Sequence, residues 1–267
     1  MRSLRLRFYS FRLITCAVAF GFALTAARAT AQELGKLPYV PTPQIVVDEM
    51  LKLAGVTAND FVIDLGSGDG RTVITAGKRG VPAMGIEFNP DLVGHAQRQA
   101  EAESVGGKVS FMQGDIFATD FSKATVVTLF LLPELNERLR PTLLNMKPGT
   151  RVVSNTFEMG DWEPDDRTEV SQGCTTYCRA LLWIVPAKVE GTWRLPGGDI
   201  KLTQTYQKLA GTLTLDGRSI PISDGRMKGD AITLTAGGKS FTGKVNGDSI
   251  ALSDATGGAA MTATRAP

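Results

Sequence analysis

Apolar and amphipathic stretches alternate along the chain between Pro38 and Pro186. Five short apolar runs predict buried strands, at 61–65, 82–87, 108–112, 125–132 and 150–155. Four stretches with apolar residues at helical spacing predict helices, at 42–54, 71–79, 90–103 and 133–145. Two further extended segments follow without an intervening helix and predict an antiparallel hairpin, at 168–172 and 179–185. Because strands that alternate with helices are typical of a parallel sheet, we expect an α/β fold with a Rossmann-like, seven-stranded sheet.

The pattern changes after Ala187. Short alternating segments are separated there by Gly and Asp turns, and no stretch of ten residues has helical spacing. The sequence Gly229-Asp-Ala-Ile recurs from Gly247 as Gly-Asp-Ser-Ile, as expected of successive hairpins in a meander. We therefore predict an α/β domain over 32–187 and a small antiparallel all-β domain, a barrel or a sandwich, over 188–267. We interpret the second domain as a structural or partner-docking unit.

The first 31 residues have the order of features of an export signal. Four arginines lie within 2–12, an apolar run covers 13–24, and Ala29-Thr-Ala31 supplies the small residues that precede a cleavage site. We predict cleavage after Ala31 and a periplasmic or secreted protein. An uncleaved membrane anchor is the alternative, although the apolar run is shorter than the roughly 20 residues that a spanning helix needs.

Composition and charge narrow the classes of function. Hydrophobic residues make up 43% of the chain and charged residues 21%, which provides enough apolar material for a packed core. Residues 1–31 hold five arginines and no acid, so the rest of the chain has 24 basic and 27 acidic side chains, a net charge of −3. A weakly acidic protein lacks the basic surface of non-specific nucleic-acid binding. The single histidine, His95 in a predicted helix, excludes a multi-histidine metal site, so we predict neither a nucleic-acid partner nor a metal.

The segment 62–71, with the sequence Val-Ile-Asp-Leu-Gly-Ser-Gly-Asp-Gly-Arg, carries the clearest chemical signal. A buried strand ends in this segment, three alternate glycines follow, and a helix opens at Arg71. Glycine lets the backbone turn sharply and approach a ligand, and the first turn of a helix offers unpaired N–H groups. We predict a cofactor site formed by Asp64, Gly66, Ser67, Gly68, Asp69 and Gly70. Taken alone, such a loop also fits a dinucleotide-binding fold.

Carboxylates at the ends of successive predicted strands identify the ligand more closely. Glu87 ends the second strand, where it can accept hydrogen bonds from both ribose hydroxyls. Asp115 follows the third strand, next to Ile116, and can meet the exocyclic amine of adenine. Asp64 and Asp69 would repel a pyrophosphate but attract the amino and sulfonium groups of S-adenosylmethionine. The sequence therefore favours S-adenosylmethionine as the cofactor over a dinucleotide.

On these residues, the chain resembles the class I S-adenosylmethionine-dependent methyltransferases over about residues 38–187. The glycine motif and the two downstream acids of that family correspond to Asp64, Gly66, Gly68, Gly70, Glu87 and Asp115. Four segments resemble, more narrowly, the FAM173 group of protein-lysine methyltransferases, relatives of the Dot1-like enzymes; they are 38–43, 64–71, 85–90 and 130–133. The resemblance implies that the segment from Tyr39 to Pro43 folds over the cofactor, with Tyr39 among the cofactor-binding residues. It also implies that the acceptor is the ε-amino group of a lysine.

The acceptor is expected at the carboxyl ends of the strands, where ligands bind in open α/β sheets. A lysine must lose its proton to accept a methyl group, and Glu134, after the fourth predicted strand, is the predicted group that takes the proton or orients the amine. Asn155 and Phe157, after the fifth strand, complete the predicted catalytic residues. Phe157 and Trp162 are predicted to form an aromatic wall for an alkylammonium group. The alternatives are core packing for Phe157 and a helix first-turn acid for Glu134.

Cys174 and Cys178 are the two cysteines that follow the predicted signal. In an oxidising compartment they would close a small disulfide loop at the tip of the final hairpin, and two free thiols are the alternative.

Together these features predict a methyltransferase that acts on a lysine of a protein substrate. A membrane-associated protein is among the targets that this prediction includes. A catalytically silent S-adenosylmethionine-binding module and a small-molecule methyltransferase are the alternatives. Because S-adenosylmethionine is made inside cells, an exported enzyme would need a supply of it outside the cytoplasm.

Overall fold

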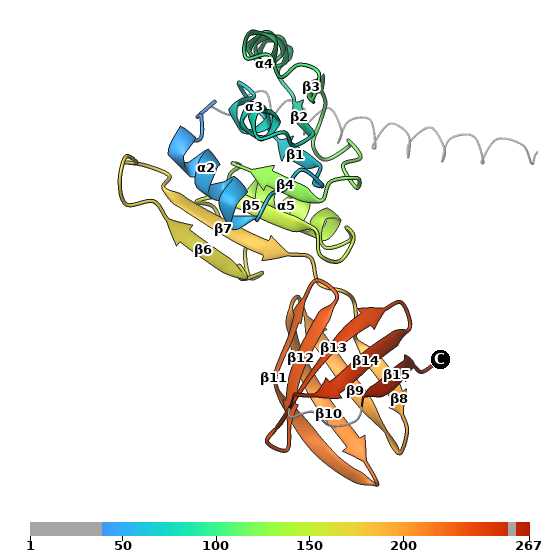
Figure 1. Cartoon of the computed structure of the whole chain (residues 1–267). Helices are drawn as coiled ribbons and strands as arrows, with labels where there is room; N and C mark the ends of the chain where they lie inside the picture. Colours follow the sequence, from blue (N-terminus) through green and yellow to red (C-terminus); the bar gives the residue numbers. More distant parts are fainter. Residues whose placement is uncertain (1–38, 256–259) are drawn as a thin grey trace, which may run out of the picture.

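The computed structural model describes residues 39–255 and 260–267, so the predicted signal segment 1–31 lies outside the described residues. Seven strands form one sheet in the order β3-β2-β1-β4-β5-β7-β6 (Figure 1). Strands β1 to β5 are parallel, β7 is antiparallel to β5, and β6 is antiparallel to β7. The strand bounds are Val62–Leu65, Ala83–Glu87, Val109–Gln113, Val126–Leu129, Arg151–Asn155, Asp166–Glu169 and Arg179–Ile184, for β1 to β7 in turn. The predicted α/β class, with a seven-stranded sheet and a final hairpin, is confirmed.

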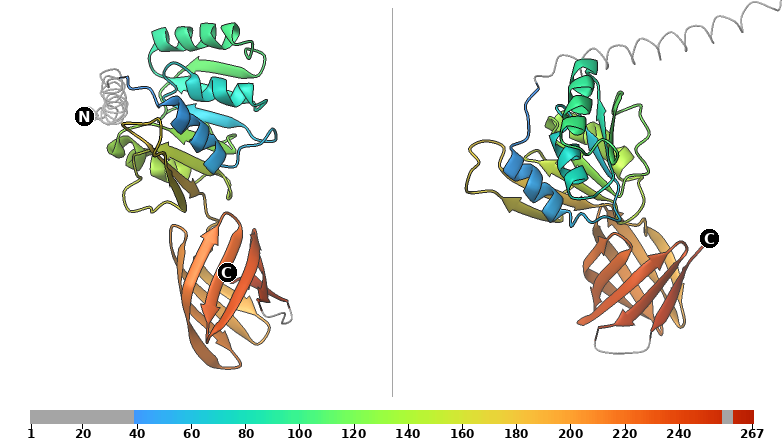
Figure 2. Two further views of the ribbon diagram at one scale, coloured as in Figure 1. Left: turned by 60° about the vertical axis from the view of Figure 1, so that its left-hand side comes forward. Right: turned by 45° about the horizontal axis from the view of Figure 1, so that its top comes forward.

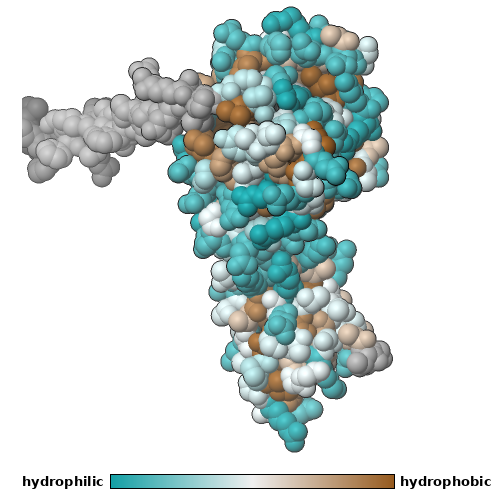
Figure 3. All heavy atoms as spheres, turned by 90° about the vertical axis from the view of Figure 1, so that its left-hand side faces the viewer, coloured by the Kyte–Doolittle hydropathy of each residue, from teal (hydrophilic) through white to brown (hydrophobic). Residues whose placement is uncertain are grey.

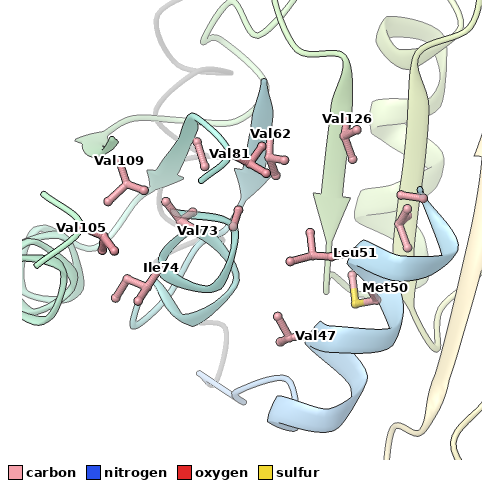
Figure 4. Packing of buried hydrophobic residues seen from close by; sticks show 14 of the residues in the cluster. Val47, Met50, Leu51, Val62, Val73, Ile74, Val81, Val105, Val109 and Val126 are labelled. Carbon is pink, nitrogen blue, oxygen red and sulfur yellow. The ribbon is translucent and has the colours of Figure 1, made fainter. Parts of the chain in front are cut away.

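Helices cover both faces of this sheet. Among the described helices, α2 (Gln44–Leu53), α3 (Arg71–Lys78) and α4 (Pro90–Ala102) pack on one face, and α5 (Pro133–Leu143) packs on the other. Figure 4 shows side chains of α2 and α3 meeting Val62 of β1 and Val126 of β4. All four residues of β1 and of β4 are buried, because a parallel sheet is covered on both faces. No helix within 39–255 or 260–267 has the length and apolar character needed to cross a bilayer.

Strand β4 ends at Leu129, three residues before the predicted end at 132. The apolar run continues, but Leu132 is extended (φ −61°, ψ 152°) and precedes Pro133, the first residue of α5. Proline restricts the residue before it to extended conformations and pre-sets the start of a helix. Residues 130–132 therefore leave the sheet at its carboxyl edge and line a cavity there.

Eight antiparallel strands after Ala187 form a closed barrel (Figures 1 and 2). The strand bounds are Gly191–Leu195, Gly198–Thr205, Lys208–Leu215, Arg218–Lys228, Ala231–Ala236, Lys239–Asn246, Ser249–Asp254 and Met261–Arg265, for β8 to β15 in turn. Each strand pairs with the next along the chain, and β15 pairs back with β8 through Arg265 opposite Trp193. Of the two predicted architectures, the barrel is observed. The alternating pattern predicts strands over about 190–255 and does not reach the last strand, β15. Ala263 is the one fully buried residue of β15, so this strand has no alternating apolar pattern.

The barrel is attached at the edge of the sheet opposite the carboxyl ends of the parallel strands. Strand β7 runs antiparallel to β5 and ends at Ile184, opposite Arg151 at the start of β5. The chain then enters the barrel, where the N–H of Ala187 donates to the carbonyl of Gly229 at 2.8 Å. Tyr206 of the barrel stacks on Trp162, with ring centroids 6.0 Å apart, and Arg226 forms an ion pair with Asp165 at 2.7 Å.

Candidate functional site

A cavity of about 280 Å³ lies at the carboxyl ends of β1, β2 and β4. Nine of the sequence-predicted site residues line it: Tyr39, Asp64, Gly66, Ser67, Gly68, Asp69, Glu87, Ile116 and Phe157. Four predicted residues do not line it: Gly70, Asp115, Glu134 and Asn155. The strand ends thus bring together residues that are up to 118 positions apart in the sequence, from Tyr39 to Phe157.

The glycine loop is a tight turn that brings the backbone of Gly66 and Gly68 to the wall of the cavity. Gly66, Gly68 and Gly70 have φ values of 77°, 53° and 82°, in the left-handed region that favours glycine. A Cβ on Gly68 would lie 2.5 Å from the ring of Tyr39. A Cβ on Gly70 would instead lie 2.7 Å from Phe111, so Gly70 serves the packing of the loop against strand β3.

Glu87 is held by two backbone donors. The N–H of Gly68 donates to Glu87 Oε2 at 2.9 Å, and the N–H of Asn89 donates to Oε1 at 2.9 Å. Each carboxylate oxygen has a second acceptor position, and the side chain lines the cavity. The carboxylate is therefore fixed in orientation and can accept two further hydrogen bonds, as vicinal ribose hydroxyls require.

The two acids of the loop differ in their surroundings. Asp64 is 7% exposed, Thr128 Oγ1 donates to its Oδ1 at 2.6 Å, and burial raises its pKa to about 7. Burial alone would raise the pKa of Asp69, but hydrogen bonds from Arg71 and Tyr39 hold that pKa below its ordinary value. Arg71 forms an ion pair with Asp69 at 2.6 Å. Arg71 thus neutralises Asp69, and Asp64 is the loop acid without a cationic partner among its hydrogen bonds. The sequence predicts the same role for the two acids, and the pairing of Asp69 with Arg71 appears only in the structure.

The segment that precedes α2 lies over the glycine loop. Arg71 Nη1 donates to the carbonyl of Thr42 at 2.8 Å, and the ring of Tyr39 lies against Gly68. Burial and the hydrogen bond to Asp69 raise the pKa of the Tyr39 hydroxyl to about 12, so it stays protonated. The family resemblance implies that the segment from Tyr39 to Pro43 folds over the cofactor; the structure places Tyr39 against the glycine loop.

Asp115 closes a turn beside the cavity. Its Oδ1 accepts a hydrogen bond from the N–H of Phe117 at 2.8 Å, while Gly114 and Ile116 line the cavity. The structure therefore presents the apolar side chain of Ile116 to a ligand and turns the carboxylate of Asp115 toward its own loop.

These residues fit a nucleoside that carries a cationic group. Glu87 offers acceptors for a ribose, Ile116 offers an apolar contact for a base, and Asp64 offers a carboxylate for a cation. Ser67 lines the cavity, but its Oγ is buried against Gly85 of β2 and has no hydrogen-bond partner among the described residues. Among the same residues, no group of His, Cys, Asp and Glu is arranged to hold a metal ion.

Three aromatic rings form the far end of the cavity, and we call them the aromatic wall: Phe130, Phe157 and Tyr177. Phe130 and Phe157 are stacked with centroids 5.9 Å apart, and Tyr177 meets Phe130 edge-on at 5.1 Å and Phe157 at 5.8 Å. Sequence reasoning found Phe157 but missed the other two. Phe130 falls inside the predicted strand 125–132, and Tyr177 lies in the loop between Cys174 and Cys178, which form a disulfide.

Trp162 does not belong to the aromatic wall, so that part of the sequence interpretation is wrong. It is fully buried between Trp183 and Tyr206, at the junction with the barrel. Asn155 is also fully buried; its Nδ2 donates to Thr42 Oγ1 at 3.4 Å, beneath the segment that covers the glycine loop. Glu134 is an exposed acid in the first turn of α5.

The raised pKa of Asp64 predicts how the stability of the protein depends on pH. Its pKa rises from the ordinary value of 3.8 to about 7 on folding, so the folded state binds this proton more tightly. The stabilisation is fully present below about pH 4 and is lost as the pH rises toward 7. We expect the free energy of unfolding of the wild type to fall over this range relative to Asp64→Asn, whose side chain stays neutral. Urea unfolding at several pH values tests this, and parallel profiles of the two proteins would contradict it.

Gly68→Ala is expected to weaken cofactor binding, with Gly55→Ala as the matched control. Both glycines have positive φ, 53° and 59°, so alanine costs each about 1–2 kcal/mol of strain. A Cβ on Gly55 meets nothing within 4 Å, whereas one on Gly68 displaces Tyr39 from the cavity wall. Thermal unfolding should show a loss for Gly55→Ala and a loss at least as large for Gly68→Ala. Calorimetry with S-adenosylhomocysteine should show weaker binding for Gly68→Ala alone, and equal affinities would mean that Tyr39 does not help to hold the ligand.

Comparisons with known proteins agree with this geometry. The sequence profile of the ANTKMT methyltransferase domain matches residues 64–166. A protein-lysine N-methyltransferase of Saccharolobus islandicus is 46% identical over 140 residues, which cover 51% of this chain and 87% of that protein. The adenine nucleotide translocase lysine N-methyltransferase of Mus musculus is 36% identical over 131 residues, or 48% of this chain; the match spans 57% of the mouse protein.

A solved structure is similar as well. It is the crystal structure of an RNA methyltransferase from Salinibacter ruber in complex with S-adenosyl-L-homocysteine, with a TM-score of 0.53 and 47% identity. The similarity covers 56% of this chain and 96% of that one. The bound product of S-adenosylmethionine in a protein this similar accords with a cofactor cavity at the carboxyl ends of the strands.

Proposed function

The chain belongs to the S-adenosylmethionine-dependent protein-lysine methyltransferase family, and we propose that it transfers a methyl group to a lysine side chain of a protein substrate. One observation carries the proposal: a single cavity runs from the buried carboxylate of Asp64 and the fixed carboxylate of Glu87 to the aromatic wall. The end of the cavity with the two carboxylates suits a cationic nucleoside. The end with the aromatic wall suits the long apolar stem and terminal nitrogen of lysine.

When bound, S-adenosylmethionine supplies an electrophilic methyl group. The contribution of the chain is to align the acceptor and to exclude water. Phe130, Phe157 and Tyr177 remove water from the lysine stem, and this desolvation lowers the pKa of the amine toward its neutral, nucleophilic form. Glu134 follows the cavity-lining Leu132 by two residues, and its exposed carboxylate is the proposed route of the proton to solvent. Asn155 acts in this proposal through Thr42, as a positioning residue.

We propose a membrane-associated protein as the target, because the rim of the cavity is apolar and exposed. Tyr39, Val40, Leu132 and Tyr177 line the cavity and are each between 39% and 47% exposed. On the face of the protein that Figure 3 shows, hydrophobic residues are interspersed with hydrophilic ones. The α/β part, 32–187, has 14 basic and 20 acidic side chains, and its net negative charge disfavours a polyanion such as RNA.

Export is also part of the proposal and rests on the order of charged, apolar and small residues in 1–31. Expression of the full chain followed by amino-terminal sequencing of the mature protein tests it. A mature chain that begins at Gln32 in the periplasm or the medium is the expected result, and a cytoplasmic chain that retains residues 1–31 would contradict export.

Transfer of a tritiated methyl group from S-adenosylmethionine tests the activity. The purified protein is incubated with membrane, periplasmic and RNA fractions, and labelled protein bands are analysed for methyl-lysine by mass spectrometry. Label in methyl-lysine of a membrane-fraction protein is expected. Label in RNA or in small molecules would contradict the lysine assignment, and S-adenosylhomocysteine binding without any transfer would favour the silent-module alternative.

A further inference from the structure

We propose that Tyr177 determines how tightly the acceptor amine is bound, and that the Cys174–Cys178 disulfide holds Tyr177 in the aromatic wall. The inference rests on the proposed function, because it concerns the acceptor end of the same cavity. Tyr177 is the member of the wall that faces solvent: it is 39% exposed, and its ring covers those of Phe130 and Phe157. Tyr177 shares the exposed rim of the cavity with Tyr39, Val40 and Leu132, so a lysine that enters beside the aromatic wall contacts this ring.

The backbone at Tyr177 is in a conformation that its own sequence disfavours. Its φ is 57°, in the left-handed region, which is unfavourable for a non-glycine residue. Such a conformation persists only where the surrounding structure imposes it. Thr156, the residue before Phe157, also has a positive φ of 62°. Two of the three rings of the wall are thus presented by strained backbone.

Contacts with strand β7 fix the strained segment at Thr156. The N–H of Thr156 donates to the carbonyl of Arg179 at 2.8 Å, and Arg179 Nη2 donates to the carbonyl of Thr156 at 3.0 Å. Phe157 therefore keeps its place without the disulfide, because these hydrogen bonds do not involve residues 171–177.

The loop that carries Tyr177 lacks the backbone hydrogen bonds that fix the segment at Thr156. In the described chain, residues 171–177 make no backbone hydrogen bond to another backbone group. The loop is held at its base by the N–H of Val170, which donates to the carbonyl of Cys178 at 2.8 Å, and by Cys174, which packs against the core beneath α2. The disulfide joins Cys174 to Cys178, the residue after Tyr177, with Cα atoms 5.8 Å apart. It is therefore the link that restricts the backbone of Tyr177.

Reduction is expected to release Tyr177. Dithiothreitol breaks the S–S bond and supplies two electrons and two protons, so that two thiols form and the reagent closes into its own cyclic disulfide. Tyr177 can then leave the left-handed conformation and uncover Phe130 and Phe157. The cofactor end should not respond, because Glu87 and Asp64 take their hydrogen bonds from Gly68, Asn89 and Thr128, outside this loop.

The test uses the full chain saturated with S-adenosylhomocysteine and titrated with n-butylamine, the side chain of lysine, by NMR. Tyr177→Ala and the double variant Cys174→Ser/Cys178→Ser are each expected to raise the dissociation constant for n-butylamine about tenfold, because the butyl chain loses its apolar contact with the Tyr177 ring. Tyr177→Phe should recover most of the affinity, because it keeps the ring. Met112→Ala is the matched control, since Met112 is 38% exposed but does not line the cavity.

Dithiothreitol should weaken n-butylamine binding to the wild type by the same factor and leave the double variant unchanged, and reoxidation should restore the wild type. Calorimetry should give one dissociation constant for S-adenosylhomocysteine in all of these forms. Unchanged n-butylamine binding in Tyr177→Ala, or insensitivity of the wild type to dithiothreitol, would overturn the inference, as would a parallel loss of S-adenosylhomocysteine binding in the variants. If the wild type itself does not bind S-adenosylhomocysteine, the proposed function fails and this inference with it.

Discussion

Replacement of Glu87 by alanine should lower the affinity for S-adenosylhomocysteine about 100-fold, or roughly 3 kcal/mol, because two hydrogen bonds to a charged acceptor are lost. The carboxylate is already oriented by the N–H groups of Gly68 and Asn89, so a ligand that meets it loses little further freedom. The same substitution leaves the N–H of Gly68 without its acceptor and loosens the glycine loop. Isothermal titration calorimetry measures the affinity.

Two companion variants make this result specific. Glu101→Ala removes an exposed acid from α4, well outside the cavity lining, and should leave the affinity within about twofold of the wild type. Glu87→Gln keeps an oxygen acceptor but not the charge, and should fall between the wild type and Glu87→Ala. A loss of less than threefold in Glu87→Ala would show that this carboxylate does not bind the ligand.

Replacement of Trp162 by alanine should lower the free energy of unfolding by about 4 kcal/mol, which is typical of a large aromatic residue removed from a core. Trp162 is fully buried, lies 6.2 Å from Trp183 and 6.0 Å from Tyr206 between ring centroids, and accepts a hydrogen bond from Trp183 Nε1 at its carbonyl. Since Tyr206 belongs to the barrel, the cavity left by alanine should also weaken the attachment of the barrel. Guanidinium unfolding followed by tryptophan fluorescence and circular dichroism measures both effects.

Trp162→Phe distinguishes packing from hydrogen bonding at this junction. Trp162 Nε1 has no hydrogen-bond partner among the described residues, so phenylalanine loses packing volume but no hydrogen bond. We expect it to be clearly more stable than Trp162→Ala. Equal stability of the two variants, or a loss below about 1 kcal/mol in Trp162→Ala, would mean that the stack contributes little to the folded state.

The same aromatic stack explains why part of the sequence interpretation was wrong. Trp162 follows the fifth strand closely enough to suggest a place beside the acceptor. The chain from 157 to 165 instead runs back along the sheet to reach β6, whose first residue, Asp166, pairs with Leu182 of β7. That path buries Trp162 at the junction with the barrel, and no local pattern indicates it because both of its ring partners are distant in sequence.

Local sequence signals were enough to predict the order and type of the elements and the place of the glycine loop. Apolar periodicity, proline at the start of α4 and α5, and glycine at positive φ act over a few residues, so they can be recognised without knowledge of the fold. Parallel strands then direct their carboxyl ends to one edge, which is why Asp64, Glu87 and Phe157 were expected near one another.

The charge and the surroundings of these side chains depend on contacts that form only in the folded chain. Burial raises the pKa of Asp64 while Arg71 neutralises Asp69, so two similar acids acquire different roles. The aromatic wall draws on three segments that join only when β4, β5 and the β6–β7 loop meet, and the barrel closes through a final strand with a single buried residue. The physical reason is the same in each case: charge, burial and closure depend on neighbours distant in sequence, which the chain acquires only when it folds.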